Sequence, residues 1–98
     1  MGEVMGVLSS DVISMEDIQA YWDVVNVSFS VHSEREAIRH GLWKKYTARD
    51  QMVHVKIKSE RVLNTLEDPE GDPDLILPEI PDIINYSIFA HRHIRGAV

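Results

Sequence analysis

The sequence contains no cysteine, so disulfide bonds and thiolate metal sites are excluded and nothing argues for an oxidising compartment. It also lacks any apolar run near the roughly 20 residues that a membrane-spanning helix needs. The N-terminal stretch MGEVMGVLSS has no basic segment followed by a long apolar core, unlike a signal peptide. We therefore expect a cytoplasmic protein that does not insert into a membrane.

Basic residues are fewer than acidic ones. The 98 residues include 10 Lys and Arg against 16 Asp and Glu, which gives a formal net charge of −6. A broad nucleic-acid-binding face neutralises phosphates with clustered Lys and Arg, so this balance predicts no nucleic-acid partner.

Motifs of several enzyme classes are missing as well. The sequence has no G-x-S-x-G, no P-loop and no G-x-G-x-x-G. Its five histidines are scattered, without the spacing of a zinc site. Nucleophilic serine chemistry has no support, and cysteine catalysis is impossible. Carboxylates and basic side chains are left as the groups that could carry chemistry.

Helical periodicity dominates what is present. After Ser14, which with Asp17 resembles an N-terminal cap, apolar residues recur three or four positions apart. The stretch VVNVSFSV is β-branched and partly alternating, so a strand is the alternative there. Ser33 and Glu36 form a capping box that predicts a new helix over about residues 34–46, in which Gly41 favours a break.

The second half of the chain predicts two further helices. Thr47 and Asp50 form a third cap, and a periodic apolar face follows it. Residues 67–78, EDPEGDPDLILP, contain three prolines, a glycine and five acidic residues and indicate a loop. The last helix is expected over about residues 79–95, with Pro81 in its first turn.

These patterns predict an all-α fold, a small antiparallel bundle of three to four helices. We expect a single helical domain over residues 14–98, preceded by an N-terminal arm at residues 1–13. A chain of this size buries a modest share of its surface, so we expect dimerisation to complete the core.

Two carboxylates stand one helical turn apart at the start of the last helix. Glu79 and Asp82 share one side of that helix, where they could hold a Mg²⁺ ion together or interact with the positive end of the helix dipole. Asp50 and Glu60 are candidate additional metal ligands, although Glu60 could instead pair with Lys56 four residues earlier.

Basic and amide side chains accompany the carboxylates. Lys58 and Arg61 repeat the three-residue spacing on the preceding helix, where they would either neutralise the acidic pair or contact phosphates. Asn85 lies on the same face as Asp82 and would hydrogen-bond a nucleobase or another helix. Tyr86 is expected in the core with its hydroxyl group at the rim.

The segments VKIKSERVLNTL and LPEIPDIINYSIFA resemble the nucleotide modification associated domain family of phage and bacterial proteins. That family pairs K-x-x-R on one helix with D-x-x-N-Y on the next, and the resemblance covers about residues 44–95. The family is similar to the MazG-like all-α nucleoside triphosphate pyrophosphohydrolases, helical bundles that usually dimerise and use Mg²⁺. The E-x-x-E motif of those enzymes is absent here, because the corresponding helix has Lys58 and Arg61 with a lone Glu60.

This resemblance implies a nucleotide ligand and Mg²⁺-dependent hydrolysis of its α–β phosphate bond, in phage nucleotide metabolism. It implies catalytic roles for Glu79 and Asp82, Mg²⁺ ligation by these two with Glu60 or Asp50, and substrate contacts from Lys58, Arg61, Asn85 and Tyr86. The missing acidic motif and the small size favour an alternative: a catalytically silent helical interaction module of a small phage or bacterial protein that binds a host partner.

Overall fold

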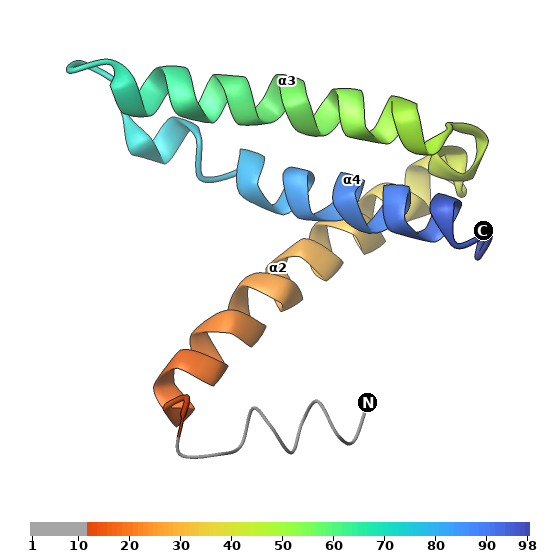
Figure 1. The fold of residues 1–98 in the computed structure, drawn as a ribbon, viewed down its shortest axis with the longest axis horizontal. Helices are drawn as coiled ribbons and strands as arrows, with labels where there is room; N and C mark the ends of the chain where they lie inside the picture. Colours follow the sequence, from red (N-terminus) through yellow and green to blue (C-terminus); the bar gives the residue numbers. More distant parts are fainter. Residues whose placement is uncertain (1–11) are drawn as a thin grey trace.

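The computed structural model describes residues 12–98, which form three α-helices and two short 3₁₀ helices and contain no strand (Figure 1). In chain order these are α2 (Met15–Arg39), η1 (Leu42–Lys45), α3 (Ala48–Glu67), η2 (Pro73–Leu75) and α4 (Glu79–Ile94). The all-α prediction is confirmed. Most of the predicted arm at residues 1–13 lies outside the described residues. Within the described part, none of the helices combines the length and the apolar character that crossing a membrane requires.

α2 is one continuous helix of 25 residues. Its N-terminus is capped as predicted, because the Ser14 hydroxyl accepts a hydrogen bond from the Asp17 N–H at 3.1 Å. The predicted helix start at Ser33 and the strand alternative for VVNVSFSV are both wrong, since both stretches lie inside α2. Glu36, the acid of that capping motif, accepts a hydrogen bond from the Gly41 N–H at 3.0 Å instead, so it stabilises the end of a helix and not the start of one.

α2 ends where the backbone becomes left-handed. His40 and Gly41 have φ angles of 49° and 73°, a region that glycine enters without steric cost. The expected break at Gly41 is confirmed. The helix predicted over residues 34–46 is therefore replaced by the end of α2 and the 3₁₀ turn η1.

α3 and α4 begin where the sequence predicts. Thr47 Oγ1 accepts a hydrogen bond from the Asp50 N–H at 3.1 Å, and Asp50 Oδ2 accepts one from the Thr47 N–H at 3.0 Å. α4 begins at Glu79 and holds Pro81 in its first turn, where the missing N–H costs no helical hydrogen bond.

α4 is the central helix of the bundle. It lies antiparallel beside α3, to which the loop containing η2 connects it, and it also packs against α2 and η1 (Figure 1). Only the C-terminal half of α2 meets this pair, while its N-terminal half projects away (Figure 1). Three helices are thus packed together, and one of them is covered along only half of its length.

The buried core is small and rich in polar groups. Its apolar side chains include Trp43, Ile76, Phe89 and Ala90, and the polar residues Ser28, Gln51, Asp82 and Asn85 are buried beside them.

Hydrogen bonds to backbone carbonyls satisfy three of these polar residues, Ser28, Gln51 and Asn85, and two of the bonds cross to a neighbouring element. Asn85 Nδ2 donates to Ser28 O at 2.8 Å and joins α4 to α2, while Gln51 Nε2 donates to Trp43 O at 3.0 Å and joins α3 to η1. Ser28 Oγ donates to Val24 O at 2.9 Å within α2. A buried polar group without a partner costs about 1–3 kcal/mol, so these bonds select the positions at which the helices meet.

Gly71 is required by the turn that follows α3. Its N–H donates to Asp68 O at 2.9 Å, and a Cβ atom added to it would lie 2.2 Å from Thr65 O. We predict that Gly71→Ala lowers the free energy of unfolding by about 1–3 kcal/mol, because the backbone must move to relieve this overlap. Urea denaturation of the wild type and the variant measures the difference.

The control is Glu70→Ala, which removes an exposed side chain from the same turn and should change stability by less than about 0.5 kcal/mol. Equal unfolding midpoints for Gly71→Ala and the wild type would contradict the prediction.

Candidate functional site

The acidic and basic pairs singled out in the sequence meet in space. Lys58 Nζ lies 2.9 Å from Glu79 Oε2 and 3.0 Å from Asp82 Oδ2, so one ammonium group bridges both carboxylates. Arg61 Nη1 lies 3.6 Å from Glu79 Oε1. Arg35, which the sequence reasoning missed, reaches across from α2 and hydrogen-bonds Asp82 Oδ1. The cluster therefore joins all three packed helices.

These contacts hold Asp82 and Lys58 in their ionised forms. Burial by itself disfavours the charged carboxylate of Asp82, whose side chain is 9% exposed, but hydrogen bonds from Arg35 and Lys58 outweigh burial and hold its pKa below the ordinary value of 3.8. Burial likewise disfavours the charged ammonium, yet hydrogen bonds to Glu79 and Asp82 raise the pKa of Lys58 above its ordinary 10.5. Asp82 and Lys58 are therefore both charged at neutral pH.

The four predicted Mg²⁺ ligands are not arranged as a metal site. Glu79 and Asp82 already face cations, and the ammonium group of Lys58 lies against both carboxylates where a shared metal ion would have to be. Asp50 is held in the capping box at the start of α3, and Glu60 is exposed. Among residues 12–98, no group of three or more His, Asp or Glu side chains could hold a metal ion. Mg²⁺ binding and catalysis by the two carboxylates stay predictions from the resemblance, and nothing proposed below depends on them.

A cavity of about 370 Å³ lies beside the ion-pair cluster, between α2, η1, α3 and α4. Arg35 belongs to both, because it lines the cavity and pairs with Asp82. Asn85 and Tyr86, predicted as nucleoside contacts, line the cavity as well. The other predicted site residues, Lys58, Arg61, Glu79, Asp82, Glu60 and Asp50, are not part of its wall.

Aromatic rings form much of that wall. The His54 ring of α3 stacks on Tyr86 of α4 with centroids 4.7 Å apart, and Trp43 of η1 stacks on Phe89 with centroids 4.5 Å apart. His32 of α2 packs against Phe89 at 4.9 Å. Rings from four elements thus lie around one cavity. The spacing of residues along the chain does not predict this arrangement.

The charges in the wall are mainly positive. Arg35 and Arg39 are four residues apart on α2, so both lie on one side of that helix, and both line the cavity. The acidic residue of the wall, Glu36, already accepts the Gly41 N–H. Arg39 makes no ion pair with any residue in the range 12–98. Its guanidinium group is therefore available to a bound anion.

Asn85 fulfils one of its two predicted roles. Its Nδ2 donates to Ser28 O, which joins two helices, and the residue also lines the cavity. The sequence analysis did not single out the arginine pair of α2. The two arginines stand four residues apart in SEREAIR, but the sequence does not show which residues of other helices lie near them.

Comparison with protein-family models, curated proteins and solved structures finds no match for this chain. The resemblance to the nucleotide modification associated domain family thus stays a prediction from the residues that carry it. What the fold and site define is a small all-α protein with a ring-lined, positively charged cavity beside a buried ion-pair cluster.

The ion-pair cluster predicts acid sensitivity. Because the folded-state pKa of Asp82 lies below the ordinary 3.8, its contribution to stability is fully present well above pH 3.8 and is lost progressively as the pH falls past that value toward the folded-state pKa. We predict that the free energy of unfolding declines below about pH 5, and that Asp82→Asn has a shallower decline. At neutral pH this variant should lose about 1–3 kcal/mol, since Lys58 keeps a buried charge with one partner fewer, while Arg35, 39% exposed, is partly solvated.

Urea denaturation between acid and neutral pH measures both effects. Asp74→Asn, which changes an exposed carboxylate in the loop before α4, is the matched control and should keep the wild-type pH dependence. An Asp82→Asn variant with the wild-type acid dependence would show that the pair does not stabilise the fold.

Proposed function

We propose that this domain binds a nucleotide in the cavity between α2, η1, α3 and α4. The observation that carries the proposal is the combination of stacked rings and arginine side chains around one space of about 370 Å³. A nucleotide joins a planar base to an anionic phosphate, so rings suit one end and guanidinium groups suit the other. Small-ligand cavities generally measure roughly 300–1,000 Å³, which includes this one.

The groups in the wall divide into two sets. Tyr86 and the His54 ring stacked on it offer a flat surface to a base, and the amide of Asn85 adds a polar group beside them. Arg39 offers the phosphate contact, since it has no ion-pair partner in the described part of the chain. Arg35 offers a second contact, and its bond to Asp82 keeps its guanidinium group oriented. Asp82 is in this view a positioning residue.

Hydrolysis of the bound nucleotide is not part of this proposal. The resemblance implies Mg²⁺-dependent cleavage, which needs carboxylates free to ligate the ion. Glu79 and Asp82 are instead engaged by Lys58, so binding without turnover is the function that the geometry supports best.

Binding can be measured by calorimetry with a panel of nucleotides, and by tryptophan fluorescence, to which Trp43 in the cavity wall contributes. We predict that nucleotides bind in the absence of Mg²⁺ and that Arg39→Ala weakens binding about ten- to a hundredfold, because a hydrogen bond to a charged group contributes about 1.5–3 kcal/mol. Pyrophosphate release in the same samples reports any hydrolysis.

The control variant is Lys56→Ala, which removes an exposed cation of α3 that does not line the cavity. It should bind nucleotides as the wild type does. If inorganic pyrophosphate binds as tightly as a nucleoside triphosphate, the rings do not contribute to binding. If no nucleotide binds at millimolar concentration, the proposal is refuted.

A second property, self-association, is supported by the projecting half of α2. Its side chains Tyr21, Val24 and Val27 are 67%, 44% and 52% exposed, and they repeat every three residues along one side of the helix. An apolar stripe along one side of a helix is normally covered by another element. A second copy offers the same stripe, so two copies can cover each other about a twofold axis. We therefore propose that the domain acts as a dimer.

We predict that the protein elutes as a dimer in size-exclusion chromatography with light scattering, and that the double variant Tyr21→Lys/Val27→Lys is monomeric, since like charges replace an apolar stripe. Asn26→Lys is the control, because Asn26 is exposed on the opposite side of α2. A monomeric wild type at all concentrations would favour the alternative, an interaction module whose exposed stripe binds a different protein.

A further inference from the structure

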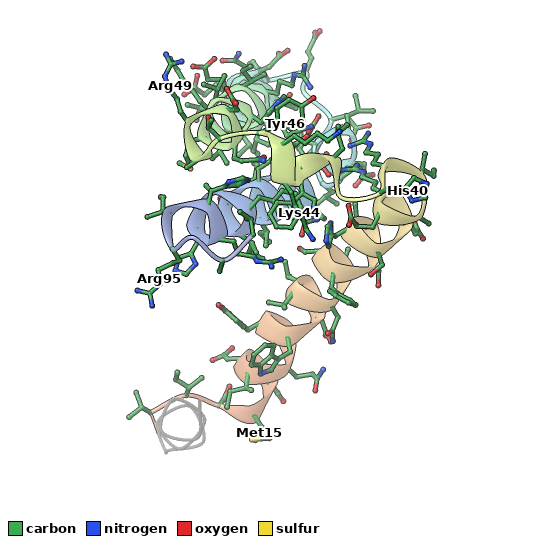
Figure 2. All side chains as sticks on the ribbon, turned by 90° about the vertical axis from the view of Figure 1, so that its right-hand side faces the viewer. Met15, His40, Lys44, Tyr46, Arg49 and Arg95 are labelled. Atoms are coloured by element: carbon green, nitrogen blue, oxygen red, sulfur yellow. The ribbon has the colours of Figure 1, made fainter. Side chains whose placement is uncertain are left out.

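Lys and Arg residues that form no ion pair within the described part of the chain gather at one end of the molecule. Three of the ten basic residues, Arg35, Lys58 and Arg61, form the ion pairs with Glu79 and Asp82. Six of the other seven lie at the end of α2, on η1 and at the start of α3, and at the end of α4. These six residues, called here the basic end, are Arg39, Lys44, Lys45, Arg49, Arg92 and Arg95. Figure 2 looks onto this end, where Lys44, Arg49 and Arg95 are labelled.

Acidic residues gather at the opposite end. Five of the sixteen acids lie in the loop at residues 67–78, where α3 ends and the chain turns back to α4 (Figure 1). The net charge of −6 is therefore unevenly distributed along the long axis. The prediction of no nucleic-acid partner rests on the total charge and takes no account of this separation.

The basic end is continuous with the cavity. Arg39 is a member of both, and Trp43, which lines the cavity, is flanked by two cations of the basic end. Arg92 Cζ lies 4.8 Å and Lys44 Nζ 5.9 Å from the centroid of the Trp43 ring. Arg92 Nε donates to Ala97 O at 3.0 Å, which fixes its side chain near this position. A ligand held by the rings can thus extend over the cations.

We propose that the cavity and the basic end together bind the end of a single-stranded nucleic acid. One terminal base occupies the ring-lined cavity, and the backbone phosphates that follow it lie over the basic end. This inference rests on the proposed function, because it uses the same cavity for the base. Stacking surfaces next to a row of cations are the usual elements of single-strand binding.

The observations favour this partner over three others. A free nucleotide needs only the arginines of the cavity wall and leaves five members of the basic end unused. An acidic peptide has negative charge but no planar base for the stacked rings, and a lipid headgroup presents its phosphate without one. A duplex keeps its bases stacked and paired, so none would be free to enter the cavity.

The test compares a mononucleotide with a single-stranded oligonucleotide of about eight nucleotides, in the range of sizes that single-strand sites cover. Binding to the full chain is measured without Mg²⁺ by tryptophan fluorescence, at salt concentrations from about 50 to 200 mM. We expect the oligonucleotide to bind at least about a hundredfold more tightly and to lose affinity steeply as salt rises, since each phosphate contact releases counterions.

Three variants assign the contacts. Lys45→Ala/Arg95→Ala should lose most of the advantage of the oligonucleotide while binding the mononucleotide unchanged, because neither residue lines the cavity. Lys56→Ala, the matched control, should change neither affinity. Tyr86→Ala should weaken both ligands, because it removes the stacking surface for the base.

The outcomes separate this inference from the proposed function. A mononucleotide that binds as tightly as the oligonucleotide would overturn the inference and leave the proposed function intact, whereas no binding of either ligand would overturn both. Oligonucleotide binding that Tyr86→Ala leaves unchanged would show that no base enters the cavity. Equal affinity for a polyglutamate peptide or for vesicles of anionic lipid would identify a general anion surface and overturn the inference as well.

Discussion

The carboxylate of Asp82 holds the three packed helices in their relative positions, because it pairs with Arg35 of α2 and Lys58 of α3 from the first turn of α4. α2 meets the α3/α4 pair mainly through α4, and the bond from Asn85 to Ser28 joins the same two helices. Removing one member of such a cluster leaves a buried charge without a partner. The resulting loss of folding free energy exceeds the net stabilisation that the ion pairs provide. The cavity depends on this cluster, since Arg35 forms part of its wall.

The scarcity of apolar side chains in the core accounts for two other features. Polar groups joined by specific hydrogen bonds occupy much of the interior. A cavity remains between the helices, and aromatic rings line it without filling it. Apolar side chains that find no place inside remain on the projecting half of α2. One chain therefore presents a hollow suited to a small ligand and a stripe suited to a second copy, and both follow from the same thin core.

The basic residues also divide into two groups with different environments. Three basic residues stabilise the fold by neutralising Glu79 and Asp82, and six others, at the end where the cavity lies, form no ion pair with any acid of residues 12–98. The composition, with acids in excess, gives no sign of this division. Lys58 and Arg61 were open to two interpretations, phosphate contacts or neutralisation, and their distances to the carboxylates favour neutralisation. In the proposed function, the phosphate contacts come from arginines of α2 that composition and spacing did not single out.

The sequence by itself determined the features that depend on neighbours within a turn or two. These are the helical class, the caps at Ser14 and Thr47, and the break at Gly41, because each rests on periodicity or on hydrogen bonds between residues a few positions apart. The capping motif at Ser33 misled for the same reason, since it looks identical whether or not a helix already precedes it. Only the tertiary structure decided that Arg35 meets Asp82, 47 positions away, and that rings from four elements line one cavity. Such contacts are set by how helices pack in space, which no local spacing encodes.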